Sequence, residues 1–227
     1  MNPLPASFTS TRIGVHTLAE HVLCAARYAA VGRVGLTPVG DGIVTPPFDG
    51  RVVGLRGIEL VDTGRDGERR SAVTTLRSAG AFFGVVPGAP PLWTPTTTDD
   101  PDAVLAVDAG GVAALADWFA LVSSAIATVH PSASQTLWPE HFDLASTVAN
   151  VTYGGSPGDA THSEPYLYVI PPGEPVPDGD RQFWNEPFGA SLPYRRITDA
   201  TDAVGFFTEA MARIAAAPTE VPHERER

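Results

Sequence analysis

Lysine is absent from this sequence, and all 15 basic residues other than histidine are arginine. Chemistry that needs an amine side chain is therefore excluded, including a Schiff-base nucleophile, a serine–lysine dyad and a lysine-based phosphate loop. Cysteine is almost absent too, because Cys24 is the only one. A single thiol excludes an intrachain disulfide and a thiolate metal cluster, and its place in an apolar helical pattern predicts a buried side chain.

Positive charge is also scarce, since 15 basic residues stand against 26 acidic ones and give a formal net charge of -11. Such a surface repels phosphate backbones and anionic lipid, so we expect neither nucleic acid nor a membrane as a partner. The N-terminus has no basic segment followed by an apolar one, and the longest apolar run, residues 118–129, is short for a bilayer span. We therefore expect a cytoplasmic protein.

Familiar enzyme signatures are missing as well. No glycine-rich nucleotide loop follows a β-rich run, and the sequence contains neither a G-x-S-x-G elbow nor an H-E-x-x-H helix. The sequence leaves open whether the protein is an enzyme and which cofactor or metal, if any, it uses. A hydrophobic content of 43% over 227 residues is ample for a sizeable core.

The first half of the chain predicts a helix followed by a β meander. Apolar residues recur at intervals of three and four over residues 13–31, which is typical of a helix. Residues 33–75 consist of short β-rich runs divided by glycine, proline and Asp-Gly steps. The pairs Asp41-Gly42 and Asp66-Gly67 are the expected hairpin tips, and a short helix is expected over residues 76–83.

A proline-rich loop is expected over residues 86–101, because so many prolines exclude regular structure. Trp93 near its centre either covers a pocket or packs on the core. Asp108 is a suitable N-cap for a helix that runs to Pro131, and another helix is expected from Asp199. Strands are expected between these helices at residues 134–138, 142–153, 165–170 and 190–197.

This order predicts an α+β fold, with antiparallel sheets built from hairpins and three main helices packed against them. Residues 1–12 are expected to be an N-terminal extension and residues 13–217 a single domain. Residues 218–227 are expected to be a charged tail, because they have no apolar period.

Three segments carry a family resemblance: LWPEHFDLA at residues 137–145, YGGSPGDATHSEPYLYV at 153–169 and FWNEPFGASLPY at 183–194. Their order resembles an uncharacterised bacterial family, described as a domain of unknown function, over about residues 13–214. The resemblance implies a single α+β domain that opens with a helix bearing a histidine, here His16. It implies no particular activity.

Catalytic candidates are His141, Asp143 and Glu164. His141 and Asp143 are two apart in an extended pattern, so both side chains are expected on one face of a strand, where they could bind a metal or form a base with its orienting carboxylate. Glu164 is the expected third group. A simple hairpin of strands 142–153 and 165–170 would separate it from His141, and these side chains could instead satisfy strand-end hydrogen bonds.

Two further polar groups have alternative interpretations. His16 and Glu20 lie at i and i+4, a spacing that suits two metal ligands on one helical turn or a solvated pair. The loop that contains Ser156, Asp159 and His162 offers the side chains of a catalytic triad, although a turn-rich loop explains it equally well.

Aromatic residues crowd the second half of the chain and suggest a pocket between its sheet and the first helix. Nearby carboxylates would favour a cation, whereas Arg195 or Arg196 turned inward would favour an acid. We expect foremost a cytoplasmic small-molecule-binding domain; the alternatives are a metal-dependent hydrolase-like enzyme that uses His141, Asp143 and Glu164, and a protein-interaction or scaffold domain. The expected ligand-binding residues are His16, Trp138, Glu140, Tyr166, Tyr168, Trp184 and Asn185.

Overall fold

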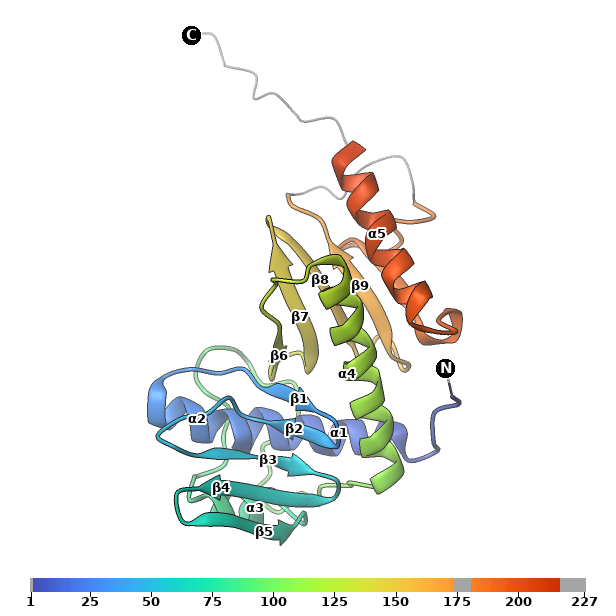
Figure 1. The fold of residues 1–227 in the computed structure, drawn as a ribbon. Helices are drawn as coiled ribbons and strands as arrows, with labels where there is room; N and C mark the ends of the chain where they lie inside the picture. The colour runs from blue at the N-terminus through green and yellow to red at the C-terminus, as the bar shows by residue number, and fades with distance from the viewer. Residues whose placement is uncertain (1, 174–180, 217–227) are drawn as a thin grey trace.

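The computed structural model describes residues 2–173 and 181–216 (Figure 1). Its first helical stretch is continuous and consists of α1 (Phe8–Leu18), one π-helical turn η1 (Ala19–Leu23) and α2 (Cys24–Val31). It begins five residues before the expected start, because Phe8 and Thr11 bury their side chains in the fold. The stretch ends at Gly32, whose φ of 65° is left-handed and suits glycine.

The first sheet is an antiparallel meander in the order β1-β2-β3-β4-β5. The predicted hairpin tips are confirmed, because Gly40–Asp41 and Arg65–Asp66 form the turns after β1 and β4. A third tip lies at Gly57, with φ 54°. The strands are β1 (Thr37–Val39), β2 (Gly42–Val44), β3 (Val52–Arg56), β4 (Glu59–Gly64) and β5 (Gly67–Ala72).

The short helix α3 (Leu76–Phe83) follows this sheet as predicted. It is capped by Thr75, whose hydroxyl accepts from the backbone N–H of Ser78 at 3.2 Å. Residues 86–101 then form neither helix nor strand, as their prolines predict.

Helix α4 (Ala109–Val129) is the central element of the fold (Figure 1). Asp108 caps it by accepting from the N–H of Gly111 at 3.1 Å, which confirms the predicted start. The helix contacts α1, α5 and strands of both sheets. By length and composition alone it could cross a membrane, yet its buried face, which includes Trp118 and Phe119, packs inside this fold as in a core helix of a globular protein.

The second sheet is also antiparallel, in the order β10-β9-β8-β7-β6. The single strand expected over residues 142–153 is wrong, because the chain reverses at Ala149 and Asn150, where φ is 50° and 64°. Asparagine tolerates this left-handed backbone, so the turn needs neither glycine nor proline. The strands are β6 (Thr136–Trp138), β7 (Asp143–Val148), β8 (Val151–Ser156), β9 (Tyr166–Ile170) and β10 (Ala190–Pro193).

After β10, one 3-10 turn, η2 (Tyr194–Arg196), leads to the last helix, α5 (Ala200–Ala216), which lies beside α4 and β9 (Figure 1). The helical stretch from α1 to α2, together with α3, α4 and α5, makes four helices among the described residues. The charged tail expected at 218–227 lies outside the described residues.

One cluster of buried apolar side chains contains residues of both sheets and of the helices between them. Gly155 lets α4 approach the second sheet, since a Cβ there would lie 2.4 Å from Cγ2 of Val122. The two sheets also meet directly, where Leu36 and Leu137 exchange backbone hydrogen bonds of 2.8 and 3.0 Å. The fold is therefore α+β, with two five-stranded antiparallel sheets of hairpins, as the sequence predicts.

Candidate functional site

A cleft of about 610 Å³ lies between β10, residues 182–185 and α5. Its volume falls within the roughly 300–1,000 Å³ of ordinary small-molecule sites. A second cavity, of about 10 Å³, is lined only by apolar side chains of the core and is too small for a ligand. The cleft is therefore the stronger candidate of the two.

One stripe of α5 forms a wall of the cleft. Asp202, Phe206, Glu209 and Arg213 all line it, and their spacing of three and four residues places them on one helix face. Gly205 belongs to the same wall and leaves it open, because a Cβ built there meets nothing within 4 Å. This stripe is not among the residues predicted from the sequence, although its helical spacing is visible there.

Most charged groups of the cleft are paired locally. Arg213 donates to Oε1 of Glu209 at 2.6 Å, and its guanidinium lies 4.4 Å from the ring centroid of Phe183. Asp202 accepts from the N–H and hydroxyl of Thr198 at 2.7 and 2.5 Å, and these hydrogen bonds lower the pKa of its carboxyl. Arg196 also lines the cleft, but no hydrogen bond or ion pair joins it to any residue that the structure describes.

Asn185 is the one expected ligand-binding residue that lines the cleft. Its amide accepts from the N–H of Ser191 at 2.8 Å and donates to the carbonyl of Ser191 at 3.1 Å. These two bonds fix the amide against β10. Trp184, its neighbour, is instead buried in the main core and meets Phe183 edge to face.

Asp143 and Tyr168 form a buried pair on the face of the second sheet that is turned away from α4. The Tyr168 hydroxyl donates to Oδ2 of Asp143, while Oδ1 has no protein partner. Burial raises the pKa of the Asp143 carboxyl, and burial together with the nearby carboxylate raises the pKa of Tyr168. Trp138 is directly opposite Asp143 on β6 and remains 38% exposed.

Two loops cover the neighbouring part of this face. Tyr166 donates its hydroxyl to Oδ2 of Asp159 at 2.7 Å, and its ring lies 4.4 Å from that of His162. Nε2 of His162 lies 3.0 Å from Oε1 of Glu186, which joins the loop before β9 to the loop before β10. Ser156 accepts from the N–H of Gly158 instead of bonding to His162, so these residues are not arranged as a catalytic triad.

The three expected catalytic residues lie in different environments. Pairing of β7, β8 and β9 places the starts of β7 and β9 at one end of the sheet, so the separation expected from a simple hairpin is wrong. Nevertheless, His141 is exposed, Asp143 is buried, and exposed Glu164 lies 3.6 Å from Arg195. Within residues 2–173 and 181–216, no group of three His, Cys, Asp or Glu side chains is placed to hold a metal ion.

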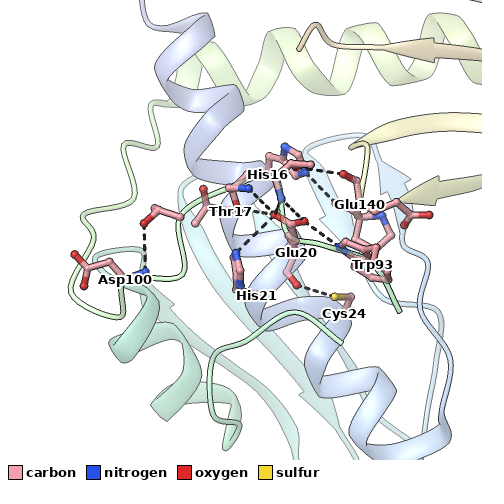
Figure 2. Close-up of polar contacts among 12 residues, drawn as sticks. His16, Thr17, Glu20, His21, Cys24, Trp93, Asp100 and Glu140 are labelled. Atoms are coloured by element: carbon pink, nitrogen blue, oxygen red, sulfur yellow. Dashed lines mark hydrogen bonds and ion pairs between the residues drawn. The ribbon is translucent and has the colours of Figure 1, made fainter. Parts of the chain in front are cut away.

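Glu20 is the centre of a second polar cluster, inside the first helical stretch (Figure 2). The solvated pair considered for His16 and Glu20 is wrong, because Glu20 is fully buried. Its carboxylate accepts from the Trp93 indole at 3.0 Å, from the backbone of Thr96 at 3.0 Å and from the backbone and hydroxyl of Thr97 at 2.9 and 2.7 Å. Burial favours a raised pKa, but these hydrogen bonds outweigh it and the pKa of Glu20 is lowered.

His16 and Glu140 join this cluster to the second sheet. Nε2 of His16 lies 2.9 Å from the carbonyl of Pro139, and because a carbonyl only accepts, Nε2 carries the proton. The His16 ring stacks on Phe142 at 5.0 Å, and burial lowers its pKa to about 4. Oε2 of Glu140 is buried without a protein partner, while its backbone carbonyl lies 3.3 Å from the Thr96 hydroxyl.

Cys24 lies below Glu20 on the same helical stretch and is buried, which confirms the prediction of a packed thiol. Its thiol is 2.9 Å from the carbonyl of Glu20, and burial raises its pKa. His21 is also fully buried, with Nε2 3.6 Å from Oε2 of Glu20. The hydrogen bonds from Trp93, Thr96 and Thr97 to Glu20 hold the proline-rich loop against the first helical stretch.

The structure therefore places most of the expected residues in three separate regions. Asn185 lines the cleft, the outer face of the second sheet holds Trp138, Asp143, Tyr166 and Tyr168, and the Glu20 cluster includes His16 and Glu140. Trp184 belongs to the main core, and His141 and Glu164 are exposed. No family model, curated protein or solved structure matches this chain, so the resemblance to an uncharacterised bacterial family stays a prediction.

Proposed function

We propose that this protein binds a small molecule in the cleft between β10 and α5. The single observation that carries the proposal is a cavity of about 610 Å³ in which α5, η2 and residues 182–185 present polar and aromatic side chains together. The Asn185 amide is already fixed by Ser191, so part of the polar lining is oriented before any ligand arrives.

The proposed site is displaced from the place that the sequence suggests. The expected pocket lay between the second sheet and the first helix, where the structure has the Glu20 cluster and the packed residues Trp93, Thr96 and Thr97. The cleft instead lies between α5, β10 and residues 182–185. Both positions use second-half aromatics and carboxylates, and of the two cavities described above the cleft is the one with room for a ligand.

Gly205→Phe tests the proposal, because its ring would fill the cleft without a clash at Cβ. A small-compound library is screened by thermal shift against the wild-type chain, and its hits are repeated on the variant. A compound at 100 times its Kd stabilises the wild-type protein by about 2.7 kcal/mol. We expect Gly205→Phe to abolish this stabilisation.

Thr208→Phe is the matched control. Thr208 is exposed on the same helix and does not line the cleft, so this variant adds the same ring outside the site. We expect it to keep the response to every hit. A library whose hits all stabilise wild type and Gly205→Phe equally, or that gives no hits, would contradict the proposal.

A further inference from the structure

We propose that the ligand of the cleft is a small organic anion, a carboxylate or a phosphate ester with an apolar group, and that Arg196 binds its charge. This inference rests on the proposed function and names the class of ligand for the same site. It depends on how the charged groups of the cleft are paired, on the direction of two neighbouring arginines and on the apolar part of the lining.

Two arginines and two carboxylates line the cleft, and one of these arginines has no partner among the described residues. Glu209 is neutralised by Arg213 at 2.6 Å, and Asp202 is held by two hydrogen bonds from Thr198. Both carboxylates therefore have partners within the protein: Glu209 is paired with a cation, whereas Asp202 keeps its charge and accepts from two neutral donors. Arg196 lines the same cleft, and its side chain has no hydrogen bond or ion pair with any described residue, so its guanidinium is the cation available to pair with a ligand.

Arg195 and Arg196 are adjacent in η2, but their side chains lie on different surfaces. Nη1 of Arg195 lies 3.6 Å from Oε2 of Glu164, and Arg195 does not line the cleft. Arg196 does line it. An arginine presents a planar fork of N–H donors that matches the two oxygens of a carboxylate or phosphate, whereas its positive charge repels a protonated amine.

The rest of the lining suits the apolar part of such a ligand. Phe206 and Leu192 belong to the cleft, from α5 and β10, and Phe183 lies beside them under the guanidinium of Arg213. The protein as a whole carries a formal net charge of -11, which disfavours anions at most of its surface. Binding of an anion therefore depends on the local charge of Arg196.

Four probes of similar size separate the classes of ligand: benzoate and phenyl phosphate as anions, benzamide as a neutral compound and benzylamine as a cation. Each is titrated into the full-length protein and followed by ligand-observed NMR. We expect the two anions to bind more tightly than benzamide and benzylamine. Arg196→Met should weaken binding of the anions by about 10- to 100-fold, the range of a charge-assisted hydrogen bond.

Arg195→Met is the matched control, because it removes the neighbouring charge outside the cleft, and its anion affinity should stay within about twofold of wild type. Circular dichroism checks that both variants are folded. Equal loss of affinity in the two variants would overturn the role of Arg196, since it would indicate a general effect of charge.

The outcomes also separate this inference from the proposed function. Preferential binding of benzylamine or benzamide that Gly205→Phe abolishes would overturn the anion assignment and leave a small-molecule site in place. The same holds if the anions fail to bind while library compounds of other charge bind in the cleft. Failure of both the probes and the library to give binding that Gly205→Phe abolishes would overturn both proposals.

Discussion

The indole Nε1 of Trp93 donates a 3.0 Å hydrogen bond to Oε1 of Glu20, and so joins the middle of the proline-rich loop to the π-helical turn of the first helical stretch (Figure 2). The backbone and hydroxyl of Thr97 bind the other carboxylate oxygen. A loop without helix or strand is thereby held in place by one buried charge. π-helical turns are rare and frequently occur at functional sites, and here the turn contains the buried Glu20.

Glu20→Gln should destabilise the protein. The carboxylate receives only donors, and an amide would turn its own N–H groups toward some of them, so buried donors lose their partner. We expect the free energy of unfolding to fall by about 2–4 kcal/mol in urea titrations followed by circular dichroism. Glu68→Gln on exposed β5 is the control and should change it by less than about 0.5 kcal/mol. Equal effects of the two variants would disprove the anchoring role of Glu20.

Acid should destabilise the fold through His16. Burial lowers its pKa in the folded protein to about 4, in surroundings that also contain Glu20, Arg12 and His21. Between its ordinary pKa of 6.5 and this value, the unfolded chain binds a proton that the folded chain does not, so stability falls as the pH falls. From pH 7 to pH 5 this costs about 1.8 kcal/mol.

His16→Gln removes that titration and keeps a donor for the carbonyl of Pro139. Its free energy of unfolding should therefore fall less than that of wild type between pH 7 and pH 5, by about 1.8 kcal/mol. Denaturant titrations at the two pH values measure the difference. The pKa assignment fails if wild type and variant lose the same amount.

Asp143→Asn should stabilise the protein at neutral pH. Burial raises the pKa of the Asp143 carboxyl. The contribution of this group to stability is therefore fully present below its ordinary pKa of 3.8 and is lost as the pH rises. Asparagine removes the buried charge and still accepts from Tyr168. We expect a gain of about 1 kcal/mol at pH 7 that shrinks toward pH 4, with exposed Asp99→Asn as control. A loss at pH 7 would mean that Tyr168 needs an ionised partner.

Gly155→Ala and Gly205→Ala should have opposite effects. A Cβ at Gly155 would lie 2.4 Å from Cγ2 of Val122, whose branched side chain has little room to move, and would push α4 away from the second sheet. We expect a loss of about 2–3 kcal/mol. At Gly205 a Cβ meets nothing within 4 Å, so alanine should stabilise α5 by about 0.5–1 kcal/mol. Differential scanning calorimetry distinguishes the two, and shifts of the same sign would contradict the packing of α4.

The sequence predicted the elements whose signals are local. The start of α4 follows from the cap residue Asp108, and the tips of the first sheet follow from the Asp-Gly steps beside them. The turn at Ala149 and Asn150 escaped prediction, because it contains neither glycine nor proline and adopts a left-handed backbone on an ordinary alanine. Without that turn, the predicted hairpin put Glu164 and His141 at opposite ends of the sheet, whereas the structure puts them at the same end.

The cleft was harder to predict, because it depends on how α5 docks beside β10. Four residues of its wall, Asp202, Phe206, Glu209 and Arg213, share one helix face and could be grouped from spacing alone. Nothing local indicates that this face meets η2, or that Arg196 and not Arg195 turns toward it. Likewise, the spacing of His16 and Glu20 does not reveal that the proline-rich loop buries the glutamate.

The bridge between Leu36 and Leu137 has a consequence during translation. The ribosome completes every strand of the first sheet by Ala72, long before it has made α4, which packs on α1, or β6, which carries the partner of Leu36. A nascent chain of that length exposes apolar surface that only later segments cover, which makes it a substrate for chaperones. Resistance of the nascent first sheet to protease should therefore appear only after Leu137 has left the exit tunnel.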